Sequence, residues 1–291
     1  MFKGSFTALI TPFKEGKVDE KVYQDLVRRQ LEAGTHGLVP VGTTGESPTL
    51  SHEEHMRVTE LCIEAVGGKV PVIAGTGSNS TDEAIILQRH AKEAGADAGL
   101  VVTPYYNKPT QAGLIAHYTA IADAVDLPVI IYNIPGRSVI DMSVETMAIL
   151  SQHTNIAGVK DATADLVRPL RTRLICGPNF CQLSGEDATV VPFLSQGGDG
   201  CISVTSNIAP ADCARLHNAW QASDMVSVNE VNDRLLPVHN ALFCESSPGP
   251  VKYAAELMGL CTAELRLPLV EIAESSMKKV KDALVGAGLL G

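Results

Sequence analysis

Short apolar runs that alternate with longer amphipathic stretches constrain this chain more than any other feature of its sequence. Most of the runs are rich in Val, Ile and Leu, as parallel strands are when helices cover both faces of their sheet. The runs are Thr7–Ile10, Gly37–Val41, Pro71–Ala74, Ala98–Val102, Pro128–Tyr132, Ala157–Lys160, Cys181–Ser184 and Cys201–Val204. About eight strand–helix units fit into the first 223 residues, which predicts an α/β fold and favours a closed TIM (β/α)8 barrel. An open doubly wound sheet is the competing interpretation.

Helix candidates lie between the runs, and two of them begin with a predicted capping box, at Ser51–Glu54 and Ser80–Glu83. The last part of the chain contains helix candidates without strands, over Val226–Phe243, Pro250–Leu257 and Val270–Val285. We therefore predict a barrel with the catalytic site over residues 1–223 and a C-terminal α-helical region over residues 224–291. A length of 291 residues suits this division, because one barrel needs about 250 residues.

The composition disfavours several classes of partner. The formal net charge is −10, and a chain this acidic repels nucleic acid and anionic membrane surfaces. The seven cysteines are scattered and form no C-x-x-C motif, which indicates free thiols in a reducing compartment. Neither a signal peptide nor an apolar run of about 18 residues is visible. We expect a cytoplasmic protein with no nucleic-acid and no membrane partner.

Many of the apolar runs are followed directly in the sequence by small polar or reactive residues. These segments are Gly42–Glu46, Gly75–Asn79, Thr103–Asn107, Asn133–Arg137 and Lys160–Thr163. Barrel enzymes build their active sites at the C-terminal ends of their strands. We therefore expect these segments to meet at one mouth of the barrel.

Lys160 ends one of the predicted strands and offers the most specific chemistry. Only a neutral amine attacks a carbonyl carbon, and burial can lower the pKa of a lysine by up to ~3–5 units. Tyr132 also ends a strand, where a phenol can relay protons while the adduct loses water. The structural alternatives are a lysine that points into solvent and a core tyrosine with a satisfied hydroxyl group.

Three further segments each allow a functional and a structural interpretation. The adjacent Tyr105 and Tyr106 fit an interface or a site. The backbone N–H groups of Gly42–Glu46 can hold a carboxylate, but the same glycines suit a plain tight turn. Arg137 can clamp a second carboxylate or lie on the surface.

Two other motifs give no reason to expect a cofactor. The Gly75–Gly77 segment starts like a dinucleotide fingerprint, but the third glycine is replaced by Ser80. His52 and His55 are three residues apart, whereas the zinc-binding H-E-x-x-H helix spaces them by four. We expect neither a metal nor an organic cofactor.

Taken together, these motifs resemble the dihydrodipicolinate synthase branch of the pyruvate-dependent Schiff-base aldolase family. The resemblance covers essentially the whole chain and rests on the order and spacing of Gly42–Glu46, Thr103–Asn107, Tyr132–Arg137 and Val159–Asp161. The segment Glu245–Lys252 resembles a family segment outside the catalytic set.

The resemblance implies a role for each catalytic residue. Lys160 forms an imine with pyruvate. Tyr132, Thr44 and Tyr106 form the proton relay, with Tyr106 inserted from the neighbouring subunit of a homotetramer built from tight dimers. The enamine then attacks L-aspartate 4-semialdehyde. The expected product is 4-hydroxy-tetrahydrodipicolinate, on the route to diaminopimelate and lysine.

The resemblance also implies the substrate-binding residues. Thr43 and Thr44 hold the pyruvate carboxylate. Arg137 binds the carboxylate of the semialdehyde at the entrance. Gly185 and Ile202 match backbone positions that line the pocket.

Lysine-sensitive members of the family bind L-lysine as an effector at the dimer interface. This chain has the same residue types at the six matching positions, Ser47, His52, His55, Asn79, Glu83 and Tyr105. We therefore predict feedback inhibition by L-lysine. The alternative is that these are ordinary surface residues.

Two other functions stay open at this point. A sialic-acid or keto-deoxy-sugar lyase keeps the Schiff base but uses another aldehyde. A catalytically inactive barrel with a binding role is the alternative from another class.

Overall fold

The structure, a computed structural model, describes residues 2–291 in two compact units. The first unit comprises Pro71–Ile202 with Phe2 and Lys3, and the second comprises Gly4–Val70 and Ser203–Gly291. The predicted division into residues 1–223 and 224–291 stays a prediction.

The first unit contains six strands, each of which pairs in parallel with the next along the chain. The strands are β5 (Ile73–Gly75), β6 (Ala98–Val102), β7 (Val129–Asn133), β8 (Ile156–Asp161), β9 (Cys181–Ser184) and β10 (Gly200–Ser203), the last residue of which belongs to the second unit. The register sets Tyr132 of β7 beside Lys160 of β8, and Asn133 beside Asp161. The carboxyl ends of β7 and β8 therefore present four polar side chains together.

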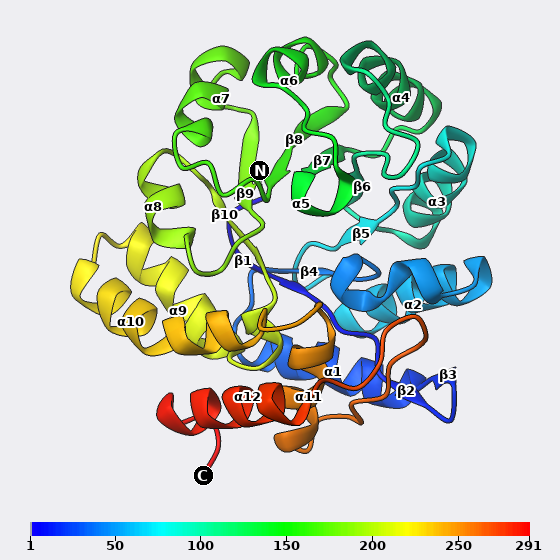
Figure 1. Cartoon of the computed structure of the whole chain (residues 1–291). Coiled ribbons are helices and arrows are strands. Elements are labelled where there is room, and N and C mark those ends of the chain that lie inside the picture. The colour runs from blue at the N-terminus through cyan, green and yellow to red at the C-terminus, as the bar shows by residue number, and fades with distance from the viewer. Residues whose placement is uncertain (1) are drawn as a thin grey trace. The chain divides into compact units, whose positions relative to one another are not determined.

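Helices follow these strands in the first unit. They are α3 (Thr81–Ala94), α4 (Gln111–Ala124), α5 (Pro135–Ser138), α6 (Val144–Leu150), α7 (Arg168–Cys176) and α8 (Val190–Ser195). In Figure 1, α3, α4, α6 and α7 form an arc outside the strands of this unit. Val101, Tyr118 and Val159 belong to the buried cluster between helices and strands. Each large apolar side chain buried there contributes about 1.5–3 kcal/mol.

The two predicted capping boxes have different outcomes. At α2 (His52–Val66), the Ser51 hydroxyl accepts from the Glu54 N–H at 3.2 Å, and the Glu54 carboxylate accepts from the Ser51 N–H at 3.0 Å. At α3 the prediction is wrong, because the Ser80 side chain makes no cap bond. The Ser80 N–H donates instead to the Ser78 hydroxyl oxygen at 3.0 Å, and Ser78 donates to Glu83.

The second unit contains two pairs of strands. β1 (Gly4–Ala8) pairs in parallel with β4 (Gly37–Val39), and β2 (Phe13–Lys14) pairs antiparallel with β3 (Lys17–Val18). Three short 3-10 helices follow strand ends or connect elements, η1 (Thr43–Gly45), η2 (Ser47–Thr49) and η3 (Thr205–Asn207). Besides α2, the α-helices are α1 (Glu20–Glu32), α9 (Pro210–Gln221), α10 (Met225–Ala241), α11 (Gly249–Leu257) and α12 (Glu274–Gly286).

The C-terminal helices of the second unit agree with the sequence pattern. α10 and α11 lie within about two residues of the predicted bounds, whereas α12 begins at Glu274 instead of Val270. Val238, Val251 and Val280, one from each helix, are fully buried in the same apolar cluster. Among the helices of residues 2–291, none has both the length and the apolar character that crossing a membrane requires.

Candidate active site

Lys160 and Tyr132 meet at the adjacent ends of β8 and β7. Both residues are 6% exposed, and the Lys160 Nζ lies 4.1 Å from the centroid of the Tyr132 ring. An ammonium group at this distance is attracted by the face of the ring. The arrangement keeps the amine close to a phenol in a site from which most water is excluded. An amine and a phenol that are buried side by side are the groups that attack on a carbonyl and proton transfer use.

Gly185 packs directly against the lysine side chain. A Cβ atom at this position would lie 2.7 Å from the Ala162 Cβ and 3.1 Å from the Lys160 Cε. The Gly185 N–H donates to the Asp161 carbonyl oxygen at 2.7 Å, which draws the segment after β9 close to the end of β8. Only glycine permits this approach, so the structure places the predicted pocket residue Gly185 beside Lys160.

Glu186 follows in the same segment and brings a carboxyl group near the lysine. Burial raises the pKa of Glu186, the neighbouring Asp187 raises it further, and the positive charge of Lys160 opposes these effects. A carboxyl group whose pKa is raised in this way holds a proton more readily than an exposed one. Glu186 was not among the predicted site residues.

The remaining predicted residues of the first unit differ in exposure. Ile202 is fully buried in β10, while Arg137 lies exposed on α5, just after β7. Tyr106 is 90% exposed, and its φ of 70° is rarely adopted by residues other than glycine. Such a conformation costs about 1–3 kcal/mol. The Tyr106 ring of this chain therefore points into solvent from a strained backbone.

Thr43 and Thr44 lie in the second unit, in η1. Thr44 is buried, and Thr43 is half-buried. The turn is held by a hydrogen bond of 2.8 Å from the Thr11 hydroxyl to the Gly45 carbonyl oxygen. Glu46 ends the turn with a left-handed φ of 57°. The backbone of this turn is therefore constrained at the C-terminal end of η1.

A fully enclosed ion pair fastens the same turn. The Glu46 carboxylate accepts from the Lys252 Nζ of α11 at 2.6 Å and from the backbone N–H of Arg266 at 3.2 Å. The side chains of Glu46 and Lys252 are 1% and 0% exposed. The Lys252 Nζ also lies 4.2 Å from the centroid of the Phe13 ring. Burial lowers the pKa of Lys252, and Glu46 only partly offsets this effect.

The predicted effector residues fall into two groups. In the first unit, the Asn79 side chain donates to the Tyr105 carbonyl oxygen at 3.4 Å. Burial raises the pKa of the Tyr105 phenol, and the negative charge of Glu83 raises it further. These three residues are therefore close together. In the second unit, the predicted residues are the half-buried Ser47 on η2, with the exposed His52 and the buried His55 on α2.

Four charged residues near the predicted site or its partners were not predicted from the sequence, Asp161, Arg168, Glu186 and Lys252. Arg168 carried a usable signal, because it follows a loop and stands in the first turn of α7, where the helix dipole disfavours a cation. The position of Lys252 gave no signal that it would be buried. A lysine in an amphipathic helix normally indicates a solvated face.

Comparisons with known proteins match essentially the whole chain. The model of the dihydrodipicolinate synthetase family matches residues 1–287. A 4-hydroxy-tetrahydrodipicolinate synthase of Rhodospirillum centenum is 66% identical over 290 residues, with 100% of each chain covered. A chloride-inhibited dihydrodipicolinate synthase of Acinetobacter baumannii, solved with pyruvate, is 46% identical with a TM-score of 0.97 and 100% of each chain covered. A dihydrodipicolinate synthase of Cyanidioschyzon merolae, solved with lysine bound, is 39% identical with a TM-score of 0.96 and 99% of each chain covered.

The same comparisons decide the fold class. The parallel strands and surrounding helices form the predicted (β/α)8 barrel, and the C-terminal helices are present. The open doubly wound sheet is thereby excluded.

Proposed function

This chain belongs to the dihydrodipicolinate synthetase family, and we propose that it condenses pyruvate with L-aspartate 4-semialdehyde through a Schiff base on Lys160. The product is 4-hydroxy-tetrahydrodipicolinate, on the route to diaminopimelate and lysine. The enzyme is a lyase that makes a carbon–carbon bond. The observation that carries the proposal is the buried Lys160, with its Nζ 4.1 Å from the centroid of the Tyr132 ring.

The reaction begins when the neutral Lys160 amine attacks the keto carbon of pyruvate. The carbinolamine loses one water molecule to give an imine, and loss of a methyl proton converts the imine into an enamine. The enamine carbon attacks the aldehyde carbon of the semialdehyde. The amino group of the semialdehyde then displaces Lys160 from the imine carbon, which closes the ring and frees the enzyme. One water molecule is released overall.

The proposed proton relay consists of Tyr132, Thr44 and Tyr106. Tyr132 fits the first place in the relay, because its ring already lies against the lysine amine. Thr43 and Thr44 hold the pyruvate carboxylate, while Arg137 binds the carboxylate of the semialdehyde. Gly185 and Ile202 line the pocket. Arg137 is exposed, which suits a residue at the entrance of the site. Its guanidinium group can bind a carboxylate with two parallel hydrogen bonds.

We further propose a cytoplasmic homotetramer in which Tyr106 enters the site of the neighbouring subunit. A strained backbone that directs an aromatic ring into solvent is consistent with a ring that has its partner on another subunit. Sedimentation velocity of the purified protein tests the assembly, and a monomer with full activity would contradict the role of Tyr106.

We also propose feedback inhibition by L-lysine. Asn79, Glu83 and Tyr105 lie close together, and the Glu83 carboxylate suits an ammonium group. The test measures turnover at rising L-lysine concentration for wild type, Glu83→Ala and the matched control Asp82→Ala on the same helix. Only Glu83→Ala is expected to lose sensitivity while keeping turnover. A wild type that millimolar lysine leaves unaffected would refute this proposal.

Borohydride trapping tests the central chemistry. The protein is incubated with pyruvate, reduced, digested and mapped by mass spectrometry. We expect one reduced pyruvyl adduct, on Lys160, and none in Lys160→Ala. An adduct on another residue would refute the proposed function. Turnover with a sugar aldehyde instead of the semialdehyde would favour a sugar lyase.

A further inference from the structure

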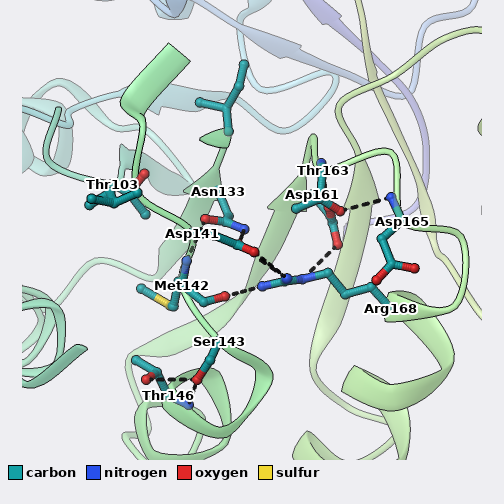
Figure 2. A network of polar contacts seen from close by, with 12 residues as sticks. Thr103, Asn133, Asp141, Met142, Ser143, Thr146, Asp161, Thr163, Asp165 and Arg168 are labelled. Carbon is teal, nitrogen blue, oxygen red and sulfur yellow. Dashed lines mark hydrogen bonds and ion pairs between the residues drawn. The ribbon is translucent and has the colours of Figure 1, made fainter. Parts of the chain in front are cut away.

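A buried arginine lies behind the predicted catalytic lysine and joins three segments of the first unit. Arg168 is 6% exposed, and its Nε lies 3.5 Å from the Asp161 Oδ2. Its other two nitrogens donate to the Asp141 Oδ2, at 3.2 Å, and to the Met142 carbonyl oxygen. Figure 2 shows Asp161, Asp141 and Met142 gathered around the guanidinium group. One side chain therefore links the end of β8, the segment after α5 and the start of α7.

The end of β7 is fastened to the same segment. Asn133 is fully buried, and its side-chain NH2 donates to the Asp141 Oδ1 at 2.6 Å. Its side-chain oxygen accepts from the Met142 N–H at 3.0 Å. Asn133 and Asp161 are register partners, so Arg168 and Asp141 connect the two strand ends from behind.

Asp161 is also held within its own loop. Its Oδ1 accepts from the N–H of Thr163 at 2.9 Å and from the Thr163 hydroxyl at 2.7 Å. The carboxylate therefore has one oxygen fixed by the loop after β8 and the other directed toward Arg168. This leaves the end of β8 little freedom to move relative to α7.

The alternation of side chains along a strand gives this network its importance. Successive residues of a strand point to opposite faces. Asn133 and Asp161 therefore face away from the side on which their neighbours Tyr132 and Lys160 meet. A contact that sets the spacing of the two strand ends behind the sheet also sets the spacing of the amine and the phenol in front of it. Misplacing a reacting group by about 1 Å can cost about 100-fold in rate.

The chemistry of the network indicates that Arg168 holds its neighbours in position more than it stabilises the fold. A cation in the first turn of a helix is opposed by the helix dipole, and charged groups lose hydration when they are buried. Apolar residues of similar volume could fill the same space. Only a planar guanidinium group with several fixed donors contacts two carboxylates and a carbonyl oxygen at once.

We propose that Arg168 is a positioning residue which, through Asp161 and Asp141, holds the ends of β7 and β8 so that Lys160 attacks the keto carbon beside Tyr132. The inference rests on the proposed Schiff-base function. It predicts that loss of the guanidinium group slows imine formation on protein that is still folded.

The experiment measures the rate of imine formation by quenching the enzyme–pyruvate mixture with borohydride at successive times. Arg168→Met is expected to lower this rate about 10-fold to 100-fold per folded site. Once imine formation limits turnover, kcat should fall, while kcat/KM for the semialdehyde, which reports the second half-reaction, should stay within about a factor of two of wild type. Arg168→Lys keeps the charge but not the three contacts, and it should recover only part of the rate. The matched control is Arg171→Met, since Arg171 lies on the same helix, is exposed and pairs with Asp165 at 3.9 Å.

Three outcomes would overturn the inference. The first is an Arg168→Met protein that traps pyruvate at the wild-type rate. The second is a loss that disappears when the rate is divided by the amount of folded protein. The third is an Arg168→Lys protein with the full rate, because charge alone would then suffice. If Arg168→Met does not fold, Asp161→Asn removes the same link with a smaller change, and a wild-type rate there overturns the inference as well. A wild type without any adduct on Lys160 would instead refute the proposed function.

Discussion

Each unit contains a buried ionic network next to residues of the predicted site, and the two networks are built differently. In the second unit, Glu46 and Lys252 form one short ion pair with both side chains almost completely enclosed. In the first unit, Arg168 is a hub with several partners, one of which, Asp141, is 50% exposed. Loss of one partner from a closed pair leaves an uncompensated buried charge. When Arg168 loses one of its partners, its other contacts stay in place, and water can reach part of the network.

The networks share one electrostatic property. Burial lowers the pKa of Lys252 in spite of Glu46, and burial raises the pKa of Asp161 in spite of Thr163 and Arg168. In both cases the loss of hydration outweighs the partner. A buried pair of this kind is weak grounds for stability. Each network is instead attached to a predicted catalytic segment, Thr43–Thr44 in one unit and Lys160 in the other. The comparison therefore indicates that both networks hold the predicted catalytic segments in position.

The largest effect is expected from Lys252→Met. The substitution leaves the Glu46 carboxylate buried without its cation, which should reduce the free energy of unfolding by about 3–5 kcal/mol. Urea unfolding at pH 7 measures this. The double variant Glu46→Gln with Lys252→Met should recover most of the loss, and Lys278→Met, which removes an exposed lysine, should change nothing measurable. A single variant as stable as wild type would show that the two networks do not differ as described.

An intermediate effect is expected when the stabilities of wild type and Asp161→Asn are compared at neutral and at acidic pH. The folded-state pKa of Asp161 is raised above 3.8 by burial, so its contribution to stability is greatest below pH 3.8 and is lost as the pH rises through the folded-state pKa. Wild type should therefore gain stability relative to Asp161→Asn when the pH falls from 7 toward 3.8. Thermal unfolding of both proteins at the two pH values measures the difference. A relative loss for wild type would mean that Arg168 outweighs burial.

The smallest effect is expected from Asp141→Asn. Asp141 is half-exposed, and an asparagine there keeps one acceptor oxygen, which can still accept from the Asn133 side chain. The loss in unfolding free energy should stay below about 1 kcal/mol. Imine formation should slow less than in Arg168→Met. An equal or larger loss than in Lys252→Met would remove the distinction between a closed pair and a hub.

The sequence by itself determined the alternation of strands and helices, the barrel class and the C-terminal helices. It also placed Lys160 and Tyr132 at strand ends, because parallel strands covered on both faces appear as short apolar runs that stop where the chain becomes polar. The capping box at Ser51 was equally local. Features that depend on neighbouring residues and on the period of the apolar positions were therefore accessible before the structure.

Only the tertiary structure decided which polar groups meet. The prediction for Ser80 failed because a third residue, Ser78, takes the N–H that Glu83 was expected to bind. Glu46 and Lys252 are 206 residues apart, and no local pattern relates them. A charged residue in a helix normally indicates a surface, since burying it alone costs several kcal/mol. Whether such a residue finds an oppositely charged partner elsewhere in the chain depends on how the elements pack. No single segment of the sequence determines that packing.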